Sequence, residues 1–250
     1  MPAAEAGWKG NKLMIHGIFF DIGWTMERPA TDDWFRTRSF YELYPDIRPS
    51  RFDPETFRHA CAAALQYLTD HHDLHSLQDE EEVFTHYYQL LVSSLPGCTI
   101  SDEDARKLAH AFACDDDKYV PIGPVQKTLA LLKQQGYRLG IISDTYPSIV
   151  PQLTHAGLLK YFDCTTYSFA LNTFKPDPRM YEDALAKMGL PAAETVFIDD
   201  LPGNLKAAES FGMHGIQSLA NPDTVPDSSF PSIHEPSELP ALLCTLSRQA

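Results

Sequence analysis

The stretch GIFFDIGWTM, from Gly17 to Met26, decides the fold. With the residues before it, this stretch forms the apolar run LMIHGIFF over 13–20, which is typical of a strand buried on both faces. One carboxylate, Asp21, follows the run directly. In open α/β sheets, active sites form beyond the carboxyl ends of the strands. The stretch therefore predicts a strand that presents a functional acid at the edge of a sheet.

Strand and helix patterns alternate strictly after VPIGP, which covers 120–124. Helix patterns cover 125–136, 178–189 and 203–212, with a further helix after 148, and strand patterns cover 137–143, 161–168, 195–199 and 214–219. Gly189 stands where a helix commonly ends, and Asp177 before Pro178 is a typical helix start. The alternation predicts a three-layer, Rossmann-like α/β fold around a parallel sheet. Residues beyond 221 are expected to wrap the surface and to end in a short helix near 239–247.

Between about residues 31 and 117 the pattern is helical throughout, with about four helices. Ser101, followed by acids, is a typical N-cap for the last of them. The simplest topology joins the isolated first strand to the later sheet. We therefore expect a catalytic α/β core formed by 13–26 and 118–250, with an all-helical cap inserted over 27–117.

Composition and charge exclude several classes of function. The chain has 250 residues and a formal charge of −14, which disfavours nucleic acid and anionic membrane surfaces as partners. The five cysteines contain no CxxC pair, which indicates a reducing compartment rather than a disulfide framework. The N-terminus lacks the apolar core of a signal peptide, so we expect a short disordered leader and a cytoplasmic protein. A small molecule is the expected partner, and the sequence indicates no oligomeric state.

Three of the predicted strands end in polar residues that would meet at one edge of the sheet. Asp21 follows GIFF, Ser143 follows LGII, and the pair Asp199 and Asp200 follows VFI. Lys175, in the segment FKPDP, falls in the loop between the second and third of these strands. The strand ends and this loop predict one polar site that contains several acids and a single ammonium.

The segments DIGWT, IISD, FKPDP and VFIDDLPGNLKAA, in this order and context, resemble the four motifs of the haloacid dehalogenase-like (HAD) superfamily. The resemblance covers the alternating core and implies the helical cap. It implies that Asp21 is the nucleophile, that Ser143 donates a hydrogen bond to a transferring phosphoryl oxygen, and that Lys175 neutralises charge between nucleophile and substrate. A carboxylate nucleophile forms a covalent intermediate that water then hydrolyses.

The same resemblance implies a Mg²⁺ site held by Asp21 and Asp200, with the backbone carbonyl of Gly23 as a further ligand. Such a hard cation takes oxygen ligands, and it would offset the repulsion between two carboxylates and a phosphate. Asn204 matches an outer-sphere acid or amide of this metal site. Asp199 would orient Lys175 or a metal-bound water.

Thr25 would tie the nucleophile loop by a hydroxyl hydrogen bond. Trp24, where the family usually has Gly, is either a substrate-facing wall or a packed loop aromatic. Asp144 is a candidate substrate contact, or the cap of the next helix. Arg36 could hold a substrate group in the manner of a bidentate clamp, or lie on a solvated helix face.

The departure from the family pattern is Gly23, where phosphatases of this family carry a second Asp that acts as general acid and base. Loss of a general acid is worth roughly 10²- to 10⁴-fold in rate. Three chemistries tolerate the loss: hydrolysis of a small phosphorylated metabolite with a good leaving group, dehalogenation, whose leaving halide needs no proton, and phosphonate cleavage. Phosphonate cleavage ranks third, because it usually needs a lysine from the cap and the cap has few, with Lys107 and Lys118 near its end. If Gly23 instead marks an inactive enzyme, the chain is a catalytically silent binding protein. The segments IDD and GNLKAA keep the metal-binding form of the fourth motif, which favours Mg²⁺-dependent phosphoryl transfer.

Two further patterns are explained by ordinary structural roles. His71 and His75 in DHHDLH have the i, i+4 spacing that zinc sites use, although a polar helix end accounts for them. Cys114 and Cys164 lack a paired histidine in the sequence, so thiol catalysis is not expected.

Overall fold

The computed structural model describes residues 14–249 and divides the chain into two compact units. The first, called the core unit, contains 14–28, 120–144 and 156–249 of the described residues. The second, called the helical unit, contains 29–119 and 145–155. The expected leader over residues 1–13 lies outside the described part of the chain.

The core unit is built on a six-stranded sheet with the order β5-β4-β1-β6-β7-β8, in which every pair of neighbours is parallel. The strands are β1 (Gly17–Phe20), β4 (Arg138–Ser143), β5 (Cys164–Tyr167), β6 (Thr195–Asp199), β7 (His214–Ser218) and β8 (Ser232–Ile233). Phe20, the last residue of β1, lies opposite Ile141 of β4 and Ile198 of β6. The predicted α/β fold with a parallel sheet is confirmed, and this register brings the ends of the three central strands to one edge.

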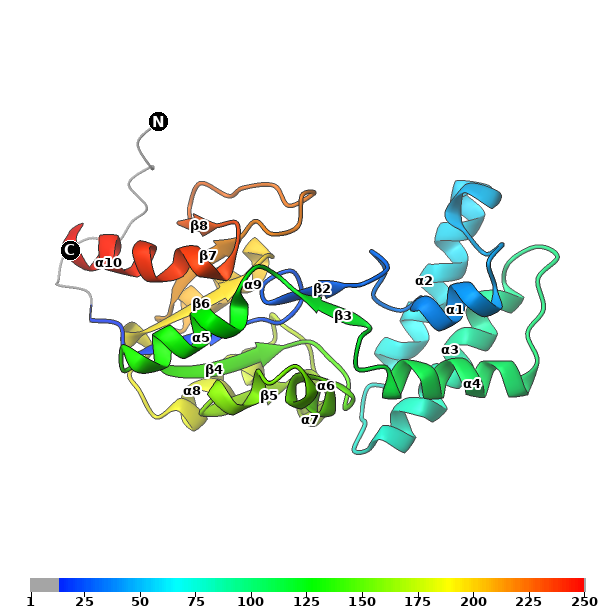
Figure 1. Ribbon diagram of the computed structural model, residues 1–250, viewed down its shortest axis with the longest axis horizontal. Coiled ribbons are helices and arrows are strands. Elements are labelled where there is room, and N and C mark those ends of the chain that lie inside the picture. The colour runs from blue at the N-terminus through cyan, green and yellow to red at the C-terminus, as the bar shows by residue number, and fades with distance from the viewer. Residues whose placement is uncertain (1–13, 250) are drawn as a thin grey trace. The chain divides into compact units, whose positions relative to one another are not determined.

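Helices cover both faces of this sheet. They are α5 (Val125–Gln134), α7 (Ser168–Leu171), α8 (Pro178–Met188), α9 (Pro202–Ser210) and α10 (Leu239–Gln249), with short 3₁₀ turns η2 (Leu159–Tyr161), η3 (Ala192–Glu194) and η4 (Pro236–Glu238). Figure 1 shows α5 and α10 on the near side of the sheet. Phe19 and Phe197 share a buried cluster with Met180 of α8 and Leu205 of α9.

Close packing against β1 explains the glycine at position 140 of β4. A Cβ built on Gly140 of β4 would lie 2.5 Å from Cδ1 of Phe19 in β1. Real Cβ atoms do not approach this closely, so the glycine in LGII leaves space for the ring of Phe19.

The helical unit contains α1 (Arg38–Leu43), α2 (Pro54–Asp70), α3 (Leu77–Ser93), α4 (Asp102–Cys114), α6 (Ile149–His155) and the 3₁₀ turn η1 (Pro49–Arg51). The four helices expected between 31 and 117 are therefore present. The side chains of Ser76 and Ser101 accept hydrogen bonds from the third residue after each, which caps α3 and α4. Phe84 of α3 stacks on Phe112 of α4 with ring centroids 4.0 Å apart, and this contact fixes the two helices against each other.

The division between the units differs from the expected boundary because α6 belongs to the helical unit. Ser148, just before α6, donates its backbone N–H and its hydroxyl to the two carboxylate oxygens of Glu80 in α3, each at 2.6 Å. Lys118 donates to Ser148 Oγ at 2.8 Å and to the carbonyl of Phe112 at 2.6 Å. These buried polar groups hold the segment 145–155 to α3 and α4.

A two-stranded sheet of β2 (Glu27–Pro29) and β3 (Tyr119–Pro121) contains two of the four points where the chain passes from one unit to the other. The sequence pattern did not predict this sheet, nor the two-residue strand β8. The helix expected near 239–247 is present as α10.

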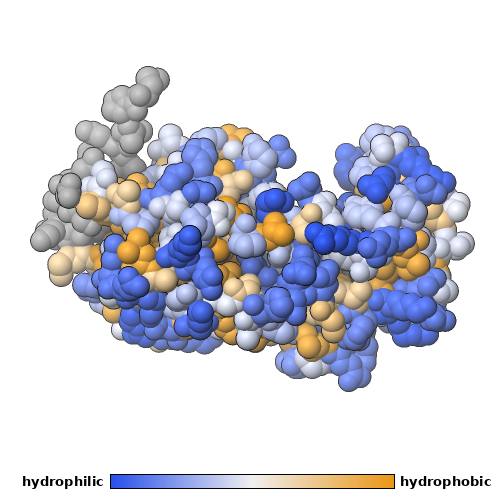
Figure 2. Space-filling model, in the orientation of Figure 1, coloured by the Kyte–Doolittle hydropathy of each residue, from blue (hydrophilic) through white to orange (hydrophobic). Residues whose placement is uncertain are grey.

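Hydrophilic residues dominate the face of each unit that Figure 2 shows, with hydrophobic residues scattered singly or in small groups. Single exposed apolar residues of this kind are normal. Within residues 14–249 no helix combines the length and the apolar character needed to cross a membrane.

Candidate active site

The candidate active site lies at the carboxyl ends of β1, β4 and β6. Asp21 is the residue after β1, and its backbone N–H continues the ladder by donating to the carbonyl of Ile198 at 2.9 Å. Ser143 is the last residue of β4, and Asp199 is the last residue of β6. All three are buried. The backbone of each is held by the sheet, so their side chains are positioned on a rigid element.

Lys175 joins two of these acids. It comes from the loop before α8, and its Nζ donates to Asp21 Oδ1 and to Asp199 Oδ2, both at 2.7 Å. The side chain of Lys175 is only 3% exposed, so the two contacts are charge-assisted bonds shielded from water. The backbone N–H of Lys175 donates to Asp144 Oδ1 at 2.9 Å. Asp144 therefore positions the lysine loop, a role that neither sequence interpretation of Asp144 included.

Asp199 is fully buried and is held from several directions. Its Oδ1 accepts from the backbone N–H of Leu201 at 2.8 Å. The amide nitrogen of Asn204 donates to both Asp199 oxygens, at 3.1 and 3.0 Å. The expected orienting contact between Asp199 and Lys175 is thus present. The amide nitrogen of Asn204 thus faces Asp199, and its outer-sphere role at a metal site stays a prediction.

The site carries more negative than positive charge. The pKa of Asp21 is raised to about 7, because burial and the charges of Asp199 and Asp200 together outweigh the lowering effect of Lys175. Burial and the neighbouring Asp199 also raise the pKa of Asp200 to about 6, against the opposing effect of Lys175. The raised values have one physical cause: a single ammonium serves several carboxylates in a region that excludes water.

The donor set fits a hard divalent cation. Asp21 and Asp200 offer carboxylate oxygens. Burial and the surplus of negative charge raise the pKa values of both groups, and a bound cation would lower them again. Gly23 offers a backbone carbonyl on a half-buried loop. Oxygen donors of this kind suit Mg²⁺ better than softer metals.

The loop after Asp21 is held by its own main chain. The carbonyl of Ile22 accepts from Thr25, Met26 and Glu27 at 3.3, 2.9 and 3.0 Å. The expected tie by the Thr25 hydroxyl is not formed: Oγ1 is buried and has no hydrogen-bond partner among residues 14–249. Gly23, two residues earlier, has no side chain that could accept this bond.

Trp24 has a left-handed backbone conformation with φ 51°, a region that favours glycine. The loop is fastened to the end of β7, because Ser218 Oγ donates to the carbonyl of Trp24 at 2.7 Å. A half-buried Trp is therefore held at a backbone position that costs of order 1 kcal/mol for a residue with a Cβ.

Arg36 fits neither of its two sequence interpretations. It lies in the helical unit, precedes α1, and is only 9% exposed. Its guanidinium forms an ion pair with Asp33 and donates to the hydroxyl of Tyr41 at 3.3 Å. It also lies over the ring of Phe57, 4.9 Å from the centroid. The guanidinium is thus committed to the interior of that unit.

Two residues that support the site were not predicted from the sequence. Gln217 Nε2 donates to the carbonyl of Asp200 at 3.3 Å, and Ser218 holds the carbonyl of Trp24. Both end the buried strand β7 in HGIQS. The rule that found Asp21 and Ser143, a polar residue at the end of an apolar strand, would also have selected these two.

Curated relatives of both hydrolase types match this chain. The (S)-2-haloacid dehalogenase of Pseudomonas sp. (strain YL) is 33% identical over 113 residues, which are 44% of this chain and 48% of the relative. The phosphoserine phosphatase of Thermus thermophilus is 30% identical over 101 residues, which are 40% of this chain and 41% of the relative. The matched region thus spans less than half the length of either relative.

A solved structure with the same fold is that of the HAD-hydrolase YfnB from Bacillus subtilis, bound to magnesium. It has a TM-score of 0.64 and 16% sequence identity, and the match covers 92% of this chain and 99% of the other. The family model of haloacid dehalogenase-like hydrolases matches residues 28–212, well over half of the sequence. On this match, and with the parallel sheet and inserted helices described above, the chain belongs to the haloacid dehalogenase-like hydrolases.

Proposed function

We propose that this chain is a Mg²⁺-dependent phosphohydrolase that acts on a small phosphorylated metabolite through an aspartyl-phosphate at Asp21. The observation that carries the proposal is the contact of Lys175 with both Asp21 and Asp199 at 2.7 Å, beside the raised pKa values of Asp21 and Asp200. A site with this charge arrangement suits an anionic substrate only when a divalent cation is added.

In the proposed reaction, Lys175 fixes Asp21 through Oδ1, and the other carboxylate oxygen attacks phosphorus. The bond from phosphorus to the leaving oxygen breaks, and a phosphoryl group remains on Asp21. Water then attacks phosphorus, which breaks the bond to Asp21 and releases inorganic phosphate. When bound by Asp21, Asp200 and the Gly23 carbonyl, Mg²⁺ would supply the positive charge that offsets repulsion between carboxylate and phosphate.

Ser143, at the end of the strand next to β1, is the proposed hydrogen-bond donor to the transferring phosphoryl oxygens. Asp199 and Asn204 position Lys175 and do not touch the substrate. Gly23 supplies no proton to the leaving group, so the proposal favours substrates whose leaving group departs as a stable anion, such as aryl or acyl phosphates.

Dehalogenation through an ester of Asp21 is the second candidate. It is supported by the absence of a side chain at position 23, because a halide leaves without a proton, and by the 33% identity to an (S)-2-haloacid dehalogenase. A catalytically silent binding protein is the third reading.

An assay panel separates these candidates. The chain is incubated with aryl phosphates, acyl phosphates and chlorinated or fluorinated 2-haloacids, with Mg²⁺ or with EDTA, and released phosphate, chloride and fluoride are measured. We expect phosphate release that depends on Mg²⁺. The Asp21→Asn variant should lose this activity, and the control variant Asp223→Asn, which changes an exposed residue, should keep it. Halide release that persists in EDTA, without phosphate release, would replace the first candidate by the second.

Labelled water gives an independent answer. In phosphoryl transfer the ¹⁸O atom enters inorganic phosphate, because water attacks phosphorus. In dehalogenation water attacks the carbonyl carbon of the aspartyl ester, so the label enters the Asp21 carboxylate. Mass spectrometry of the peptide that carries Asp21 distinguishes the two routes.

A further inference from the structure

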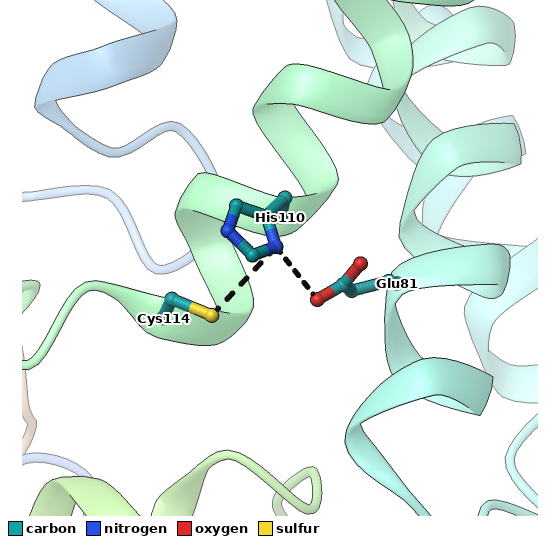
Figure 3. A group of neighbouring side chains, drawn as sticks. All are labelled: Glu81, His110 and Cys114. Carbon is teal, nitrogen blue, oxygen red and sulfur yellow. Dashed lines mark hydrogen bonds and ion pairs between the residues drawn. The ribbon is translucent and has the colours of Figure 1, made fainter.

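The helical unit carries a group of metal-type ligands that belongs to no part of the candidate active site. Figure 3 shows Glu81 of α3 facing His110 and Cys114 of α4. Glu81 Oε1 lies 2.9 Å from His110 Nδ1, and Cys114 Sγ lies 3.8 Å from the same nitrogen. The three candidate ligand atoms all lie within 4.8 Å of one another. We propose that Glu81, His110 and Cys114 form a binding site for a borderline transition-metal ion of the Zn²⁺ type.

The backbone already places the three side chains together. His110 and Cys114 are four residues apart on α4, a spacing that puts both on one face of the helix. Glu81 comes from α3, and the stacked rings of Phe84 and Phe112, one from each helix, fix the distance between α3 and α4. The group is therefore positioned by the packed interior of the helical unit and does not depend on a flexible loop.

The distances are close to those that a tetrahedral ion requires. With metal–ligand bonds of about 2.0–2.3 Å, neighbouring N, O and S ligands of such an ion are roughly 3.4–3.6 Å apart. The observed separations of 2.9 and 3.8 Å lie on either side of this range. The third separation, between the carboxylate oxygen of Glu81 and Cys114 Sγ, is at most 4.8 Å. Side-chain movements of about 1 Å would therefore bring the three donors around one ion.

The chemistry of the donors selects the kind of ion. One nitrogen, one sulfur and one carboxylate oxygen form a mixed set that suits Zn²⁺ or Co²⁺ and is poor for Mg²⁺, which prefers oxygen. His110 Nδ1 faces both an oxygen and a sulfur, but a neutral ring nitrogen shares at most one proton between them. A cation at that point would instead contact all three donors at once.

Exposure leaves room for a further ligand. The side chains of Glu81 and His110 are 34% and 66% exposed, and Cys114 is exposed as well. Three protein ligands plus water form the open type of zinc coordination. A bound ion would link α3 to α4 at the surface and would stabilise the helical unit, because the ligands meet only in the folded chain.

This arrangement corrects one sequence interpretation. Cys114 does have a paired histidine, His110, one helical turn before it. At His71 and His75 the structure agrees with the expected polar helix end, because α2 ends at Asp70 and His71 is its C-cap. His71 Nδ1 lies 2.9 Å from the carbonyl oxygen of Tyr67, and His75 Nε2 lies 3.4 Å from Asp73 Oδ1.

Cobalt titration tests the proposal on the whole chain. Co²⁺ is added in a non-thiol reductant and excess Mg²⁺, and the thiolate-to-cobalt charge-transfer absorption is recorded. The candidate active site offers oxygen donors from Asp21 and Asp200, so a metal ion bound there gives no thiolate band. The absorption therefore tests the metal site in the helical unit even if the chain proves not to be a phosphohydrolase. We expect one equivalent of Co²⁺ to bind at micromolar concentration with this band, and Zn²⁺ to displace it and raise the Tm.

Matched variants assign the ligands. Cys114→Ser should remove the band, and His110→Gln and Glu81→Gln should each weaken binding at least about tenfold, since even outer-shell changes at metal sites cost 10- to 100-fold. Cys244→Ser and His59→Gln, which change exposed residues outside the group, should leave binding unchanged. A missing thiolate band, binding only at millimolar Co²⁺, or an unchanged band in Cys114→Ser would overturn the proposal.

Discussion

Replacing Lys175 by Met removes the only ammonium that contacts the acids of the candidate site among the described residues. Met has nearly the same length and no charge, so the change keeps the volume of the side chain and deletes both hydrogen bonds. Turnover should fall at least about 100-fold, as it does when a charge-stabilising donor is removed from other active sites. The effect on stability is more informative, because it depends on pH in a direction that the structure sets.

The pKa of Asp21 is raised from 3.8 to about 7 by burial, with Lys175 opposing the rise. Because the folded-state pKa exceeds the unfolded value, this proton contributes stability that is full below about pH 4 and is lost as pH rises toward 7. At about 1.4 kcal/mol per pH unit, the loss over that window is about 4 kcal/mol. Without Lys175 the folded-state pKa of Asp21 rises further, so in the variant the loss continues above pH 7.

The difference in unfolding free energy between wild type and Lys175→Met should therefore grow with pH. Breaking a buried ion pair costs about 3–5 kcal/mol, and protonation of Asp21 at low pH offsets part of that cost. Urea unfolding, followed by circular dichroism in EDTA at about pH 6 and pH 8, measures the difference. We expect the value at pH 8 to exceed that at pH 6 by about 1 kcal/mol or more.

Lys133→Met is the matched control. Lys133 pairs with Asp163 at 2.7 Å, but the two side chains are 33% and 30% exposed. Such a pair is worth about 0–1 kcal/mol. The pKa of Asp163 is lowered, because hydrogen bonds from Lys133 and Leu139 outweigh the effect of burial, so the loss should not change between the two pH values. A pH-independent loss in Lys175→Met, or a loss that is smaller at pH 8, would refute the charge arrangement assigned to the site.

Three further predictions concern other parts of the chain. Gly23→Asp restores a carboxyl that could protonate a leaving group, so hydrolysis of alkyl phosphates should rise by about 10²- to 10⁴-fold while aryl phosphates change little, as steady-state assays of both substrates would reveal. Asn204→Ala removes both amide hydrogen bonds to Asp199 and should cost about 1–3 kcal/mol in unfolding free energy, with a fall in kcat that Asn204→Gln does not fully repair. Lys118→Met leaves Glu80 buried without its cation and should cost about 3–5 kcal/mol by thermal unfolding at neutral pH. Because burial lowers the pKa of Lys118 from 10.5 to about 8, the wild type should gain stability relative to this variant as pH rises between those values.

The central part of the fold follows from local patterns in the sequence. Each strand of the candidate site is an apolar run that ends in a polar residue, and parallel pairing brings those ends together without further information. For this reason the sequence alone suffices to place Asp21, Ser143 and Asp199 at one edge of the sheet. The N-caps at Ser101 and Asp177 could also be predicted from the sequence, because a cap depends only on the residues that follow it.

Features that depend on contacts distant in sequence could not be predicted in this way. The segment around Ser148 belongs to the helical unit because Glu80, 68 residues earlier, accepts its hydrogen bonds. The burial of Arg36 depends on helix packing that its local sequence does not specify. The cluster of Glu81, His110 and Cys114 likewise needs two helices to pack, because Glu81 lies on α3 and the other two residues lie on α4.

The most direct test of the central claim asks whether the Asp21 carboxylate becomes phosphorylated. The chain is mixed with Mg²⁺ and an aryl or acyl phosphate, quenched during turnover with borohydride, digested and sequenced by mass spectrometry. Borohydride reduces an aspartyl-phosphate to homoserine, so we predict homoserine at position 21 and none in the Lys175→Met variant. Phosphate release that continues while Asp21 stays unmodified, or homoserine at any other aspartate, would contradict the assignment of Asp21 as the nucleophile.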